Sequence, residues 1–373
     1  MNKTWAVNEE RIKKEFSELV AIDSVTFSER QMADCLAGKL RNLGFQVTED
    51  QAGERYGGNA GNLYAYLPGT LPGEPVLFSA HMDTVSPGKG KRAVFCEDGR
   101  ILSGGDTVLG ADDLAGVVEI FEGVRYIQEA EKPHRGIEIL FAIGEEAHAK
   151  GTNVFDFSKI KSREAYVLDM SGEIGSAVLQ APSIVSFKAV MRGRAAHAGF
   201  EPEKGTNAIQ AMSRAIAGIR QGRLDGETTL NIGTISGGEA LNIVSEVCTC
   251  VGEARSYNHE RVLQCVEQAK KVFVQSAEEL GASCDFEERV EITAYRVDES
   301  QPVVKRFQES CARLGIEPKL VSTFGGSDNN NFVQHGIDGI VLSCGMYQVH
   351  STNEYTIVEE LKKGAALVAE LLA

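Results

Sequence analysis

The stretch Val76-Leu-Phe-Ser-Ala-His81-Met-Asp83 is a continuous apolar run that ends in a histidine and an acid. Apolar runs without polar alternation are typical of strands that are buried on both faces of a largely parallel sheet. Similar runs return at 137–143 and 166–168, and the intervening segment 114–127 carries apolar residues at helical spacing. Buried strands that alternate with amphipathic helices predict an α/β fold around a central sheet.

From about residue 181 the pattern changes to strands and helices in the order β-α-β-β-α-β, which is the ferredoxin-like split motif. The predicted strands are 184–190, 228–235, 241–254 and 284–292, and the predicted helices are 207–221 and 260–280. We therefore predict an α/β catalytic domain of residues 1–180 and 294–373. A ferredoxin-like α+β domain of residues 181–293 is inserted into it.

Composition excludes several classes of partner. The formal net charge is −15, whereas nucleic acid and anionic membranes both attract Lys and Arg clusters, so neither is expected to bind. The first fifteen residues show no apolar leader segment, and no apolar run approaches the length of a membrane span. The eight cysteines include no C-x-x-C pair and are interpreted as reduced thiols. These features predict a cytoplasmic protein.

Acids and histidines stand at the ends of the apolar segments. The candidate metal ligands are His81, Asp112, Glu146, Asp169 and His350. A set of only nitrogen and oxygen ligands that includes histidines suits zinc, cobalt or manganese, whereas magnesium and calcium prefer oxygen alone. Each residue has an ordinary structural explanation on its own, but the five together favour a metal site.

Two further carboxylates fit such a site. The adjacent pair Glu145-Glu146 can divide two tasks that hydrolysis at a metal requires, since one carboxylate binds the ion and the other moves the proton of the attacking water. Asp83 can accept a hydrogen bond from the second ring nitrogen of His81, as histidine ligands usually require.

The chain carries three motifs, Ser79-Ala-His-Met-Asp-Thr-Val85, Leu109-Gly-Ala-Asp-Asp-x-Ala-Gly116 and Gly144-Glu-Glu146. Together with the inserted domain, they resemble the peptidase T (tripeptide aminopeptidase) branch of a di-zinc family. That family also includes aminoacylases, glutamate carboxypeptidases and succinyl-diaminopimelate desuccinylases. The resemblance extends over essentially the whole chain.

The resemblance implies a role for each candidate. Asp112 would bridge two Zn²⁺ ions, with Co²⁺ or Mn²⁺ as substitutes, and a cis peptide would join it to Asp113. One ion would be completed by His81 and Asp169, and the other by Glu146 and His350. Glu145 would be the general base, and Asp83 would hold the His81 ring.

The resemblance also implies substrate contacts. His197 would stabilise the oxyanion, reaching across a homodimer that forms through the inserted domain. Asn242, Arg255, Gly325 and Gly326 would bind substrate, and a guanidinium such as that of Arg255 can bind both oxygens of a carboxylate. The chain departs from peptidase T at Phe324, where that enzyme has an arginine before the glycine pair.

We therefore predict a metal-dependent hydrolase of short peptides that acts as an aminopeptidase. The alternatives within the family are a di-zinc carboxypeptidase and an N-acyl-amino-acid deacylase. The alternative from another class is a catalytically silent peptide-binding protein on the same scaffold.

Overall fold

The computed structural model describes residues 7–373, which form two compact units. One comprises the residues up to 180 together with 296–323 and 327–373, and the other comprises 181–295 and 324–326. The first six residues, which belong to the stretch where we found no apolar leader, lie outside the described range. No described helix combines the length and apolar character needed to cross a bilayer.

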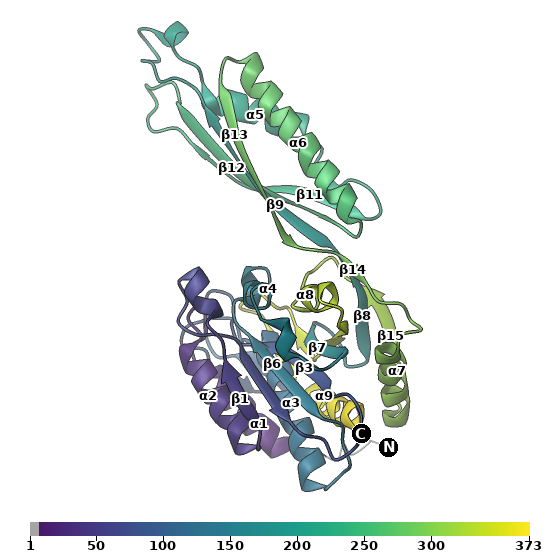
Figure 1. Cartoon of the computed structure of the whole chain (residues 1–373). Helices are drawn as coiled ribbons and strands as arrows, with labels where there is room; N and C mark the ends of the chain where they lie inside the picture. The colour runs from purple at the N-terminus through teal and green to yellow at the C-terminus, as the bar shows by residue number, and fades with distance from the viewer. Residues whose placement is uncertain (1–6) are drawn as a thin grey trace. The chain divides into compact units, whose positions relative to one another are not determined.

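The first unit is built on a mixed sheet of nine strands among the described residues (Figure 1). In spatial order the strands are β1 (Gln46–Glu49), β2 (Leu63–Leu67), β6 (Ile137–Ala142), β3 (Val76–His81), β7 (Glu164–Met170), β16 (Asp338–Ser343), β8 (Ser176–Ala181) and β14 (Tyr295–Arg296), with β15 (Lys319–Ser322) paired to β8. The central strands β6, β3, β7 and β16 run parallel. Every residue of β3 and β6 is buried, which confirms the expectation of a sheet covered on both faces.

Helices cover the two faces of this sheet. The helices of the first unit are α1 (Glu9–Val20), α2 (Arg30–Asn42), α3 (Ala111–Glu129), α4 (Lys150–Asn153), α7 (Pro302–Leu314), α8 (Asn329–Gln334) and α9 (Val358–Leu372). Helix α3 packs between α9 and strands β3 and β7, and it is therefore apolar around most of its circumference. A small separate sheet joins β17 (Met346–Tyr347), β18 (Tyr355–Ile357), β5 (Arg100–Ser103) and β4 (Ala93–Phe95).

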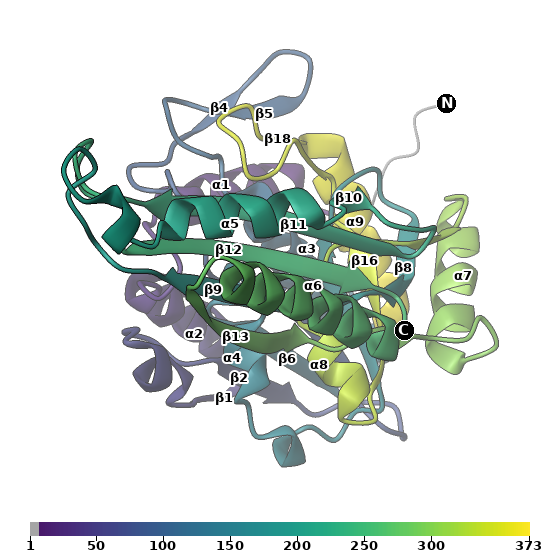
Figure 2. The same cartoon turned by 90° about the horizontal axis from the view of Figure 1, so that it is seen from above.

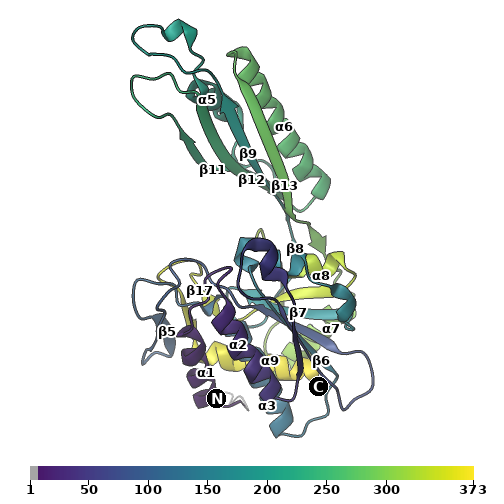
Figure 3. The same cartoon turned by 60° about the vertical axis from the view of Figure 1, so that its left-hand side comes forward.

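The second unit is an antiparallel sheet with two helices on one face, which Figures 2 and 3 show from two directions. The strand order is β10 (Gly222–Arg223), β11 (Thr228–Gly237), β12 (Val247–Ser256), β9 (Ser183–Arg192) and β13 (Ser283–Ile292), and the helices are α5 (Ala208–Gly218) and α6 (His259–Glu279). This is the expected ferredoxin-like arrangement. The prediction of a strand from 241 was wrong, because β12 begins at Val247, and the segment before it forms an isolated bridge between Ile243 and His197 instead of a continuous ladder.

Helix α3 contains a glutamate, Glu119, whose carboxyl group is buried. Glu119 is 0% exposed, and neither of its carboxyl oxygens has a hydrogen-bond partner among the described residues. A Cβ atom at Gly364 of α9 would lie 2.0 Å from the Glu119 carboxyl carbon, so a glycine is needed there. Burial, assisted by the charge of Asp113, raises the pKa of Glu119 well above its ordinary value.

Replacing Glu119 by methionine should stabilise the protein increasingly as the pH rises. A carboxyl whose pKa is raised by folding favours the unfolded chain once the pH exceeds about 4.5, by up to about 1.4 kcal/mol for each further pH unit. The gain in Glu119→Met should thus be larger at pH 7 than at pH 5, by at most about 3 kcal/mol, as measured by urea unfolding. The matched control is Glu122→Met on the same helix, which should destabilise because the Glu122 carboxylate binds Arg11 at 2.6 Å. An equal effect of Glu119→Met at both pH values would contradict the assignment.

Candidate metal centre

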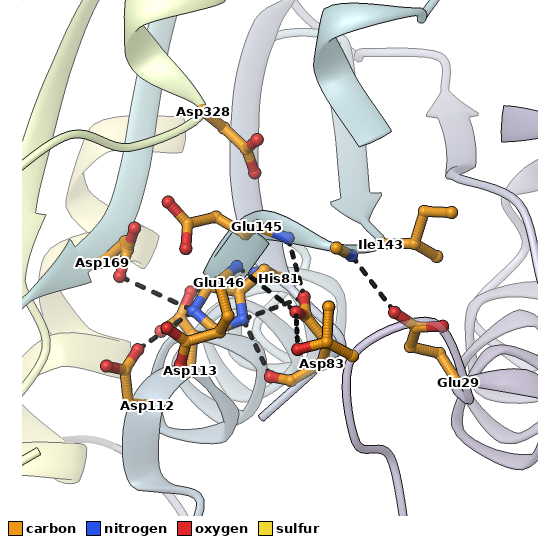
Figure 4. A network of polar contacts seen from close by, with 12 residues as sticks. Glu29, His81, Asp83, Asp112, Asp113, Ile143, Glu145, Glu146, Asp169 and Asp328 are labelled. Carbon is orange, nitrogen blue, oxygen red and sulfur yellow. Dashed lines mark hydrogen bonds and ion pairs between the residues drawn. The ribbon is translucent and has the colours of Figure 1, made fainter. Parts of the chain in front are cut away.

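The predicted ligands converge at the carboxyl ends of the parallel strands of the first unit. Figure 4 shows His81, Asp112, Glu146 and Asp169 among them. His81 is the last residue of β3, and Asp169 is the last but one of β7. Glu146 lies in the 3-10 turn Glu145–Ala147 that follows β6, and His350 lies in the loop between β17 and β18. The edge beyond the carboxyl ends of strands is where open α/β sheets bind ligands.

Asp112 stands between two sets of potential ligands. Its Oδ1 lies 3.0 Å from His81 Nε2, which is also 3.8 Å from Asp169 Oδ1. Its Oδ2 lies 3.3 Å from His350 Nε2, which is 2.9 Å from Glu146 Oε2. The peptide bond from Asp112 to Asp113 is cis, as the family resemblance implied. The structure thus brings all five predicted ligands together as two triads that share one carboxylate.

The chemistry of these side chains fits bound divalent cations. The described ion pairs of Asp112 and Glu146 are with histidines, and Glu146 Oε1 is a buried oxygen without a hydrogen-bond partner. Hydrogen bonds to Asp112 and Glu146 raise the pKa of His350 to about 10. A cation bound there would displace that proton, because imidazole binds metals in its neutral form.

Glu145 lies beside the two triads without belonging to either. It is half-buried, and Figure 4 shows its carboxylate turned toward Asp169. Burial, followed by the charge of Asp169, raises the pKa of Glu145 well above its ordinary value, and bound cations would act in the opposite sense. Gly144 allows the turn, since it has φ +59° and a Cβ there would approach Phe27 Cε1 to 2.7 Å.

Asp83 contacts both the His81 ring and the turn that carries Glu145 and Glu146. The Nδ1 atom of His81 lies 2.9 Å from the Asp83 backbone carbonyl and 3.5 Å from its carboxylate. That carboxylate accepts hydrogen bonds from the backbone N–H groups of Glu145 at 2.9 Å and Glu146 at 3.3 Å, and from the Thr26 hydroxyl at 2.9 Å. Asp83 therefore holds the turn that carries Glu145 in addition to contacting the His81 ring.

The predicted oxyanion residue His197 and Asn242 meet in the second unit. His197 Nδ1 accepts hydrogen bonds from the N–H groups of Gly199 and Phe200, both at 3.1 Å, so the neutral ring carries its proton on Nε2. The Phe200 ring stacks on the imidazole at 4.2 Å. The Asn242 backbone carbonyl accepts a hydrogen bond from Ala198 N at 2.9 Å. His197 is thereby oriented to donate from Nε2.

The other predicted substrate contacts also lie in the second unit. Arg255 donates from Nε to Glu253 at 2.7 Å and from Nη1 to the Phe324 carbonyl at 2.8 Å, so part of its guanidinium is already engaged. Gly325 and Gly326 follow Phe324, and a Cβ at Gly326 would lie 1.9 Å from Ile292 Cδ1. The role of these residues in substrate binding stays a prediction.

A nine-stranded α/β sheet with two adjoining ligand triads at its carboxyl edge defines a metal-dependent hydrolase. Comparisons with known proteins agree with this class. A profile described as the peptidase dimerisation domain of M20 enzymes matches residues 181–280, and one described as peptidase family M28 matches residues 62–213. The chain is 37% identical to YqjE of Bacillus subtilis (strain 168) over 98% of both chains.

Two solved structures are similar along almost their whole length. The aminopeptidase PepT from Bacillus cereus matches with a TM-score of 0.89 and 39% identity, and a tripeptidase from Staphylococcus aureus matches with a TM-score of 0.94 and 33% identity. In both cases 98% of each chain is covered. The chain belongs to the peptidase T-like group of the M20 metallopeptidase family, and it is a metal-dependent peptide hydrolase.

Proposed function

We propose that this protein is an aminopeptidase that removes the N-terminal residue from short peptides, tripeptides in particular. The observation that carries the proposal is the pair of triads sharing Asp112, with Glu145 beside them. The similarity to an aminopeptidase PepT and to a tripeptidase supports the choice of substrate.

The ions are proposed to be two Zn²⁺, one held by His81, Asp112 and Asp169 and the other by Asp112, Glu146 and His350. When bound, such ions lower the pKa of a water and polarise the scissile carbonyl. Glu145 takes the proton of the attacking water and passes it to the leaving amine. His197 donates from Nε2 to the developing oxyanion, a contribution that is worth roughly 3–4 kcal/mol where such donors have been removed.

A substrate panel tests the proposal. A tripeptide with a free amino group should be cleaved, its N-acetylated form should not, and chelation followed by Zn²⁺ addition should abolish and restore cleavage. Preferential cleavage of the acetylated peptide would instead identify a deacylase, and release of the C-terminal residue would identify a carboxypeptidase. Absence of cleavage of any peptide, with the metal loaded, would favour a peptide-binding protein.

We further propose that the protein is a cytoplasmic homodimer, assembled through the inserted domain that we predict at residues 181–293. The eight described cysteines are free thiols, as expected in a reducing compartment. Among the described residues, strand β10 pairs with only two residues of β11, so the following part of β11 has no partner strand on that side, and Ile235 on β11 is 54% exposed. An open edge with an apolar side chain suits pairing with a second copy.

Ile235→Lys should convert the dimer to a monomer, as measured by light scattering after size exclusion. Lys188→Ala, on the inner strand β9 of the same sheet, is a control that should leave the mass unchanged. A monomeric mass for the wild-type protein would contradict the proposal.

A further inference from the structure

The Glu354 carboxylate binds the backbone of the loop that carries Asp112. Its Oε2 accepts a hydrogen bond from Gly110 N at 2.7 Å, and its Oε1 accepts one from Asp112 N at 2.9 Å. Glu354 is 1% exposed, so water does not compete for these bonds. More than 240 residues separate the partners in sequence, so this is a tertiary contact between two loops.

Glu354 is also tied to the loop that carries His350. Its backbone N–H donates to the Ser351 carbonyl at 3.1 Å, which closes a tight turn just after His350. The next residue, Tyr355, opens β18 and pairs with Leu102 of β5. The backbone of Glu354 therefore lies between the His350 loop and the small sheet, while its carboxylate holds the backbone of Asp112.

The backbone that Glu354 binds is not regular helix. Although helix α3 is assigned from Ala111, Asp112 has φ −82° and ψ +98°, and regular helical geometry begins only after Asp113. The N–H groups of Gly110 and Asp112 consequently need an acceptor from elsewhere in the fold, since the first turn of a helix leaves its N–H groups without partners. Glu354 supplies it.

A buried lysine lies beside this arrangement. Lys91 is 3% exposed, donates from Nζ to the carbonyls of Ile22 at 3.1 Å and Gly88 at 3.3 Å, and interacts electrostatically with Glu354. Its side chain packs on Gly110, where an added Cβ would approach Lys91 Cε to 3.0 Å. Burial raises the pKa of Glu354 to about 7, whereas the hydrogen bonds that it accepts from the N–H groups of Asp112 and Gly110 act in the opposite sense and favour its charged form.

We propose that Glu354 is a positioning residue that sets the distance between Asp112 and His350 and thereby prepares both metal sites. The proposal rests on the metal roles assigned under the proposed function. Glutamine at position 354 would present an NH₂ group to one of the two N–H groups, so one of them would lose its acceptor. Asp112 would then no longer be held against the His350 loop.

The experiment is Co²⁺ binding to Glu354→Gln, followed by calorimetry and by the visible spectrum of the bound ion. The matched control is Glu138→Gln. Glu138 is likewise fully buried and accepts hydrogen bonds from two backbone N–H groups, those of Lys161 at 2.9 Å and Ser162 at 2.7 Å, but it lies at the start of β6, at the opposite end of the sheet from the ligands.

We expect Glu354→Gln to bind Co²⁺ roughly 10–100-fold more weakly and to shift its visible bands, as loss of a residue supporting a metal ligand typically does. With saturating metal, kcat should fall while KM changes little, and Glu354→Asp, which keeps the charge, should recover part of the affinity. Glu138→Gln should bind Co²⁺ like the wild type even if its unfolding midpoint falls.

Wild-type Co²⁺ affinity and spectrum in folded Glu354→Gln would overturn the inference, and so would an equal loss in Glu138→Gln. If the glutamine variant does not fold, the same measurements on Glu354→Asp decide, and wild-type values would again overturn it. Failure of the wild-type chain to bind Co²⁺ would refute the proposed function itself, which is a different result from unaltered binding in the variants.

Discussion

Glu145→Gln should keep both metal ions and lose nearly all turnover. The substitution preserves the shape of the side chain, and Glu145 belongs to neither ligand triad, so metal binding has no reason to change. The amide cannot accept the proton of the attacking water, and removal of a general base typically slows a reaction by about 10²–10⁴-fold. The measurements are kcat on a free tripeptide and metal content by atomic absorption, on the same preparation.

Glu146→Gln, one residue further along the same turn, provides the contrast. Glu146 belongs to the triad with Asp112 and His350, so this variant should lose metal together with activity. If Glu145→Gln retained activity within about tenfold of the wild type, another group would have to be the base. If it lost metal as Glu146→Gln does, Glu145 would be a ligand.

The division between ligand and base depends on how the turn is held. The N–H groups of both glutamates point at the Asp83 carboxylate, and Gly144 permits the left-handed backbone that precedes them. The two side chains consequently leave the turn in different directions, one toward His350 and one toward Asp169. Adjacent carboxylates can therefore serve different steps of one reaction.

The sequence predicted the positions of the ligands better than the contacts that support them. His81, Glu146 and Asp169 lie at or just after the ends of buried strands, and parallel strands bring those ends together at one edge of the sheet. His81 and Asp169 could be predicted in this way. The start of β12 at Val247 could not be predicted, because residues 241–246 are apolar enough to resemble a strand although they form an isolated bridge and not a continuous ladder.

Supporting contacts join loops that are distant in sequence. Glu354 binds backbone N–H groups of Gly110 and Asp112, and backbone groups carry no sequence signal. The same holds for the bond of Arg255 to the Phe324 carbonyl, which leaves less of that guanidinium for a substrate carboxylate than the sequence suggested. Only the tertiary fold shows which side chains already bind backbone N–H or carbonyl groups.

Asp112→Ala should remove both metal ions and with them the activity. Its two oxygens face different triads, Oδ1 toward His81 and Oδ2 toward His350, so one truncation deletes a ligand from each. Asp169→Ala deletes a ligand from only one triad and should leave an ion bound at the other. Metal content after dialysis should thus fall from two ions to none in the first variant and to one in the second. Since bound ions contribute several kcal/mol to such reactions, we expect at least about a 10³-fold loss of kcat/KM in Asp112→Ala. One ion retained in Asp112→Ala, at wild-type affinity, would show that this carboxylate is not shared.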